Sequence, residues 1–152
     1  MLNTLSKLAG FLTLVLSISA AESGLKVQLA GGTVSTIAPK ATLHLDLTGS
    51  ESLSLRSPKT QLEIPYRKIN TVEYGQNVSR RYAAAVLISP VLLLSKSRKH
   101  FVTLGYLDAD GKQQALVFRV DKGDIRSILA SLEARTGRRV EYQDDEARKR
   151  GK

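Results

Sequence analysis

A two-residue alternation of apolar and polar side chains runs through the first half of the chain and constrains its fold class more than any other feature. Leu43, Leu45 and Leu47 alternate with polar neighbours, and the pattern resumes over 52–56 after the turn-forming residues 48–51. Successive side chains of a strand point to opposite faces, so the alternation places the leucines on one buried face. The segment therefore predicts two antiparallel strands joined by a hairpin.

Strand signals continue on both sides of this hairpin. Gly31 and Gly32 interrupt an upstream strand-like stretch, which indicates a bulge or a bend. Pro65 has no backbone N–H to give to a neighbouring strand, so its strand lies at a sheet edge or ends there. Residues 108–112 suit a tight hairpin between the last two strands. The additional strands are expected over 26–37, 62–66, 69–74, 101–107 and 114–120.

After Asp121 the apolar period changes from that of a strand to that of a helix. The apolar positions form one stripe at helical spacing, which predicts an amphipathic helix with one buried face. Asp121 or Asp124 can cap its start, and Gly137 can adopt the left-handed conformation that ends it. The stripe consists of Ile125, Ile128, Leu129 and Leu132.

The first 21 residues have the outline of a secretory signal peptide. Lys7 precedes an apolar run over 8–18 that ends in small residues suited to cleavage. The run is shorter than the roughly 20 apolar residues that a membrane-spanning helix needs. We therefore expect export to the periplasm, the cell envelope or the medium, with retention as an anchor as the open alternative. The expected organisation is a signal peptide over 1–21, one domain over 22–142 and a disordered charged tail over 143–152.

Composition narrows the chemistry of the chain. There is no cysteine among the 152 residues, so disulfides, thiolate metal sites and thiol nucleophiles are excluded. His44 and His100 have no zinc or general-base spacing around them, and no phosphate-binding loop, dinucleotide fingerprint or nucleophile elbow occurs. The net charge of +9 favours anionic partners. We expect a protein that is not an enzyme and that uses no cofactor.

Residues 83–94 carry no charge and lie between two basic clusters. Pro90 removes a helical donor, so the run predicts a short helix that is broken or kinked at this point. Facing outward, the segment would enter the interfacial region of an anionic membrane or dock on a protein partner. Facing inward, it would be a buried helix packed on the sheet, and the sequence leaves both alternatives open. The candidate surface residues are Arg80, Arg81, Leu92, Leu93, Leu94, Lys96, Arg98 and Lys99.

The order of hairpin strands followed by one amphipathic helix resembles the bacterial branch of the pleckstrin-homology-like fold. The resemblance is carried by 62–66, 69–74, 101–107, 114–120 and the helix ending at 132–137, and it covers roughly residues 24–142. It implies an α+β, mainly antiparallel β domain: a partly open barrel or two-sheet sandwich capped by the C-terminal helix. The short apolar helical insertion over 83–94 departs from the plain fold. Phosphoinositide binding is not implied, because Lys40, Arg56 and Lys59 are scattered.

These features predict a non-enzymatic exported binding module that contacts a protein or an anionic lipid surface in the cell envelope. The alternative is a structural or assembly component that associates through an exposed sheet edge. The basic tail 148–152 follows an acidic stretch in a chain with an export signal, which argues against nucleic acid as a partner. No small-molecule substrate is indicated.

Overall fold

The computed structural model describes residues 24–38, 40–76, 87–88 and 99–152. About half of these residues form strands and two α-helices follow them, so the α+β class predicted from the sequence is confirmed at this level. The strands are β1 (Leu25–Gly32), β2 (Thr42–Asp46), β3 (Ser52–Ser57), β4 (Thr60–Pro65), β5 (Ile69–Gly75), β6 (Leu87–Ile88), β7 (His100–Leu107), β8 (Gln113–Val120) and β9 (Glu141–Tyr142). The helices are the 3-10 helix η1 (Tyr66–Lys68), α2 (Ile125–Thr136) and α3 (Asp145–Gly151).

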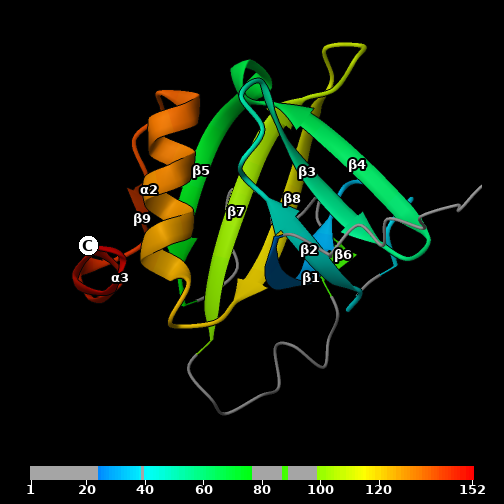
Figure 1. Cartoon of the computed structure of the whole chain (residues 1–152). Coiled ribbons are helices and arrows are strands. Elements are labelled where there is room, and N and C mark those ends of the chain that lie inside the picture. Colours follow the sequence, from blue (N-terminus) through cyan, green and yellow to red (C-terminus); the bar gives the residue numbers. More distant parts are fainter. Residues whose placement is uncertain (1–23, 39, 77–86, 89–98) are drawn as a thin grey trace, which may run out of the picture.

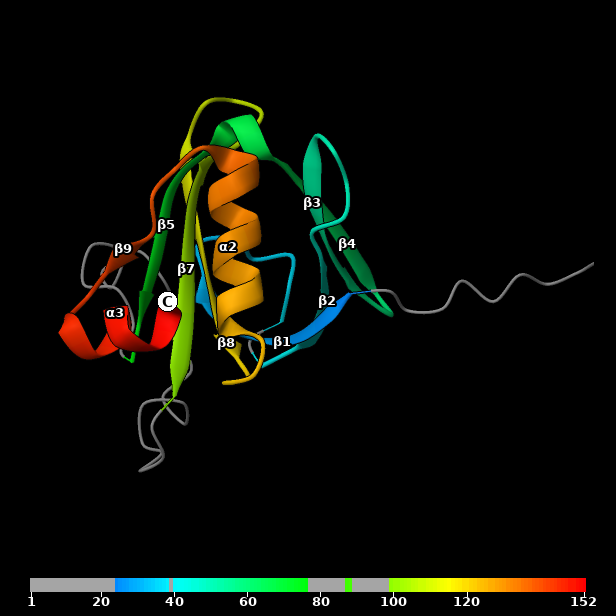
Figure 2. The same ribbon diagram turned by 60° about the vertical axis from the view of Figure 1, so that its left-hand side comes forward.

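The strands form one open, mixed sheet in the order β4-β3-β2-β1-β8-β7-β5-β9, with β6 paired to β1. All pairs are antiparallel except β5 and β9. Figure 1 shows the sheet, and in Figure 2 the strands β3 and β4 stand on one side of α2 while β5 and β7 stand on the other. At the end of α2, Arg135 donates to the carbonyl oxygens of Thr48 and Gly49 and lies over the Tyr66 ring. The helix therefore bridges the two arms of the sheet.

The glycines of β1 mark the predicted irregularity. The pairing of β1 with β8 shifts register between Leu29 and Gly31, which confirms the bulge. A Cβ on Gly32 would stand 2.8 Å from Leu116 Cδ2 and 3.0 Å from the Ala115 carbonyl oxygen, so a side chain at this position would crowd β8.

The prediction of a helix over 83–94 is wrong for the two residues of that segment that the structure describes. Leu87 and Ile88 form β6, which pairs with Gly31 and Gly32 of β1. A short apolar run has no period that separates a buried strand from a buried helix, which explains the error. The other residues of 83–94 lie outside the described part of the chain.

The predicted inward faces build one core. The leucines of β2 and β3 are buried, and so is the whole α2 stripe. The largest fully buried side chains include Tyr74 of β5 and Phe118 of β8. Pro65 is the last residue of β4, and β4 is the terminal strand of the sheet, which confirms the position predicted for this proline. The apolar periodicity of the sequence thus predicted the buried faces of these strands and of α2.

The two ends of α2 differ in how well the sequence predicted them. Gly137 has φ 67° and donates its N–H to the Glu133 carbonyl oxygen at 2.9 Å, so the predicted left-handed cap is confirmed. Asp124 occupies the N-cap position, but its side chain makes no capping hydrogen bond. Its backbone is already helical, at φ −96° and ψ −10°, whereas side-chain caps use an extended N-cap residue.

The tail expected to be disordered instead forms α3. Asp144 is extended and its Oδ1 accepts the Ala147 N–H at 2.7 Å, which caps the helix. Ala147 is buried, and the Gly151 Cα lies close to the Tyr142 ring and Leu129. The high charge of the tail suggested disorder, but the segment is capped by Asp144 and buries Ala147 against the domain.

Candidate functional site

Seven of the eight predicted surface residues lie outside the described residues. They are Arg80, Arg81, Leu92, Leu93, Leu94, Lys96 and Arg98. The eighth, Lys99, is only 6 % exposed, so the expectation of an open cation is wrong for it. Burial lowers the pKa of Lys99, and the charge of Arg119 lowers it further.

His100 is a buried polar residue and does not extend the surface basic cluster. Its Nδ1 lies 2.7 Å from the Tyr74 hydroxyl, and the two rings are stacked at 6.1 Å. Burial is the main cause that lowers the pKa of His100, followed by the charges of Arg150 and Lys122. The pair is thus a neutral hydrogen-bonded contact between β5 and β7.

This pair predicts an acid-sensitive fold. Because the His100 pKa in the folded state lies below the ordinary value of 6.5, the unfolded state binds a proton first as the pH falls. The stabilisation is complete above 6.5 and is lost as the pH falls through the folded-state pKa, with a slope of at most about 1.4 kcal/mol per pH unit. Urea unfolding between about pH 7 and about pH 5 measures this slope. The His100→Gln variant should show a flatter dependence, and an identical slope would contradict the assignment.

A more open candidate site begins at the outer edge of β4. The Tyr66 N–H donates to the Glu51 carbonyl oxygen at 2.9 Å, which continues the β3–β4 ladder by one residue. Backbone groups along a strand alternate in direction, so the backbone groups of Gln61 and Glu63 point away from β3. Pro65 belongs to the same outward-facing set, where its missing N–H costs no ladder bond. The edge of β4 therefore offers main-chain donors and acceptors to a further strand.

A pocket of about 580 Å³ lies directly beside this edge. Leu107 contributes to its wall and is 39 % exposed; in the described part of the chain no other large apolar side chain is exposed to that degree. The pocket brings together the β1–β2 connection, β4, Lys68 of η1 and the β7–β8 hairpin. Its lining consists of Thr33, Val34, Ser35, Thr36, Leu62, Glu63, Ile64, Pro65, Lys68, Tyr106, Leu107, Asp108, Ala109 and Gln114.

A polar frame holds the walls of the pocket together. The Thr33 hydroxyl donates to Gln114 Oε1, and Gln114 Nε2 donates to Asp108 Oδ2 at 2.8 Å. Lys68 Nζ donates to the Asp108 carbonyl oxygen at 2.9 Å. The hydrogen bond from Gln114 is the main cause that lowers the pKa of Asp108, with backbone N–H groups of the hairpin next. The carboxylate is ionised and serves the hairpin, and no cluster of metal ligands occurs among the described residues.

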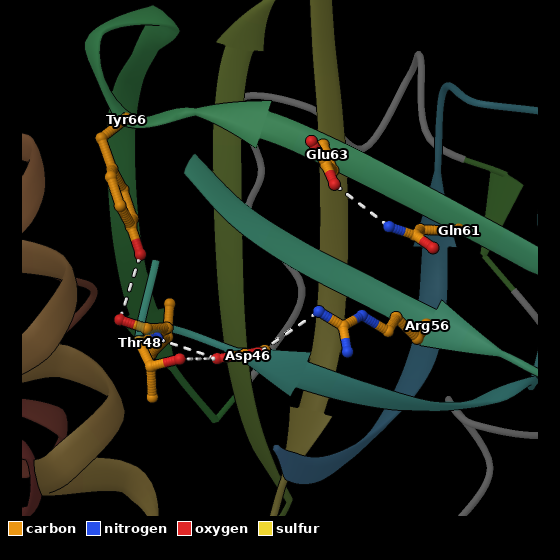
Figure 3. A network of polar contacts seen from close by, with 7 residues as sticks. Asp46, Thr48, Arg56, Gln61, Glu63 and Tyr66 are labelled. Atoms are coloured by element: carbon orange, nitrogen blue, oxygen red, sulfur yellow. Dashed lines mark hydrogen bonds and ion pairs between the residues drawn. The ribbon is translucent and has the colours of Figure 1, made fainter. Parts of the chain in front are cut away.

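The outer face of β4 is polar, in contrast to the pocket side. Figure 3 shows Gln61 and Glu63 along β4, with Gln61 Nε2 donating to Glu63 Oε1 at 3.0 Å, and Arg56 of β3 reaching Asp46 of β2 at 3.4 Å. The inward side chains of β4 are Leu62 and the fully buried Ile64. An added strand would therefore meet an apolar wall on one face and a polar surface on the other.

Comparison with protein-family models, with curated proteins and with solved structures found no match. Neither α-helix of the described residues has the length and apolar content needed to cross a bilayer.

The sequence reasoning missed the pocket but contained one signal for its edge. Pro65 predicted that its strand lies at an edge of the sheet, because proline has no N–H to give to a neighbouring strand. This edge is one side of the site. The other half depends on contacts between residues far apart in the chain, such as Thr33 with Gln114.

Proposed function

We propose that the chain is an exported, non-enzymatic binding module that captures an extended segment of a partner protein at the outer edge of β4. The observation that carries the proposal is the apolar pocket directly beside that edge. A segment that pairs with β4 gains main-chain hydrogen bonds, and its alternate side chains enter the pocket, where they are selected. Export rests on the signal-peptide pattern of residues 1–21.

The chemistry of the site defines the segment that fits best. On the inner face, Val34, Leu62 and Leu107 favour apolar side chains, ideally β-branched or aromatic ones that suit an extended backbone. On the outer face, the Glu63 carboxylate favours a polar or basic neighbour. The preferred ligand is thus an extended peptide in which apolar residues alternate with polar or basic ones.

We further propose that the domain is pleckstrin-homology-like. The hairpin strands β1 to β4 continue through β8, β7 and β5, and α2 packs between the two arms of the sheet, as the resemblance in the sequence implies. The name describes the fold and carries no ligand with it. Contact of residues 80–98 with a protein or an anionic membrane stays a prediction from the sequence.

The Glu63→Pro substitution tests strand addition at β4 without disturbing the fold. The Glu63→Pro variant removes an outward N–H that β3 does not use, so the fold is retained while a donor for an added strand is lost. Linear peptides selected from a phage-displayed library on the wild-type protein should lose affinity for Glu63→Pro by about five- to tenfold, because one hydrogen bond of about 1–1.4 kcal/mol is lost.

The matched control is Glu63→Gln, which removes the charge and keeps the N–H. It should bind the same peptides within about twofold, since a rim charge contributes little. Amide chemical shifts of Gln61 and Glu63 should move when peptide is added to the wild-type protein. Equal binding to both variants, or no selected peptide at all, would overturn strand addition at β4.

A further inference from the structure

A second concave surface lies between α2 and α3. It shares no lining residue with the pocket beside β4. Figure 2 shows α3 folded back beside α2, next to β9. The groove between them encloses about 710 Å³. It is lined by Arg126, Leu129, Ala130, Glu133, Arg139, Val140, Tyr142, Arg148, Gly151 and Lys152.

Three arginines from three separate segments surround this groove. Arg126 belongs to α2, Arg139 to the connection after it and Arg148 to α3, and all three are exposed. In the described part of the chain, none of the three guanidinium groups makes a hydrogen bond or an ion pair with a protein acceptor. Arg135 and Arg56, by contrast, are each committed to a protein acceptor. The groove therefore concentrates positive charge that the fold itself does not neutralise.

The single acidic residue of the lining is outnumbered by its basic residues, Arg126, Arg139, Arg148 and Lys152. Glu133 accepts the Val140 N–H through Oε1 at 2.8 Å, a contact that fixes the turn after α2. The floor between the arginines is apolar, because Leu129 and Val140 are buried there and the Tyr142 ring is half-buried. Burial is the main cause that raises the pKa of Tyr142, so its phenol stays protonated.

We propose that the α2–α3 groove binds an acidic peptide segment that also carries an apolar side chain. Arginine forks match carboxylates in bidentate geometry, and the apolar floor receives the accompanying side chain. The volume of the groove is larger than a free phosphate ion requires and lies in the range of ligand pockets. A flat layer of lipid headgroups would meet the arginine rim without reaching the floor. The partner defined by the groove is therefore an acidic protein segment.

The probe is a short fluorescent peptide of alternating glutamate and leucine, with its lysine–leucine counterpart as the negative control. The combined variant Arg126→Gln, Arg139→Gln, Arg148→Gln should weaken binding of the acidic peptide by at least about tenfold, since three exposed ion pairs are lost. Binding should also weaken with added salt, because the contacts are charged.

The matched control removes the same number of charges at exposed sites away from the groove, as Lys26→Gln, Lys59→Gln, Lys112→Gln. It should change the affinity by less than about threefold. An unchanged urea midpoint shows that either variant folds. The Glu63→Pro variant should bind the acidic peptide normally, which keeps this test independent of the β4 site.

Three results would overturn the proposal. Equal losses in the two triple variants would assign the binding to net charge alone. Binding to vesicles that contain phosphatidylglycerol, with none to the peptide, would make the surface a lipid site. Competition by inorganic phosphate at concentrations equal to the peptide would define a site for a small anion only.

Discussion

The Phe118→Ala variant should lose about 3–5 kcal/mol of its free energy of unfolding. Phe118 is 1 % exposed on β8, where it pairs with Leu29 of β1 and Val102 of β7. Alanine leaves a void under the centre of the sheet, and packed neighbours on two strands cannot move together to fill it. Because small domains are stable by only about 5–15 kcal/mol in total, the variant should lose a large share of its stability. Urea unfolding followed by circular dichroism measures the loss.

A graded substitution distinguishes the void from a general effect of mutation in β8. Phe118→Leu keeps an apolar side chain of intermediate volume, so its loss should be clearly smaller than that of the alanine variant. Equal losses for leucine and alanine would mean that ring packing, and not the volume of the cavity, decides the stability of the core.

The Leu132→Ala variant should lose about 2–5 kcal/mol and should loosen α2 from the sheet. Leu132 is fully buried in the last turns of α2, near the point where Arg135 contacts the β2–β3 turn. The helix joins the two arms of the sheet, so weakening it exposes both of them. Hydrogen exchange should therefore speed up at the amides of α2 and β5 before global unfolding.

Ala134→Gln is the matched control on the exposed side of α2. Glutamine is a good helix former and position 134 is exposed, so stability should change by no more than about 0.5 kcal/mol. If this variant were as destabilised as Leu132→Ala, the stripe on α2 would not be what attaches the helix.

The elements of the fold that depend on local order were predictable. The alternation of Leu43, Leu45 and Leu47 predicted β2 and its buried face. Such an alternation is recognisable within a few residues of sequence. Gly137 gave the end of α2, since only a residue tolerant of positive φ suits that position. Pro65 predicted the edge position of β4, because proline lacks the N–H that a central strand needs.

The elements that depend on distant partners were not predictable. His100 follows the basic residues Lys96, Arg98 and Lys99 in the sequence, yet its environment is set by Tyr74, 26 residues away. The charge of the tail predicted disorder. Its docking depends instead on Ala147 and on contacts with Leu129 and Tyr142, which are fixed by the fold. The pocket beside β4 is lined by four segments that are far apart in the chain. The local periodicity of a sequence does not predict which distant segments come together.

The parallel pairing of β9 with β5 limits how copies of this protein can assemble. Glu141 and Tyr142 pair with Glu73 and Tyr74, and the Gln143 N–H donates to the Tyr74 carbonyl oxygen at 3.1 Å, so the chain's own end occupies part of the rim opposite β4. A rim that is partly covered in this way offers a shorter edge to a further strand than the rim at β4 does. Strand pairing between copies should therefore favour a single pair joined through β4 over growth into fibres.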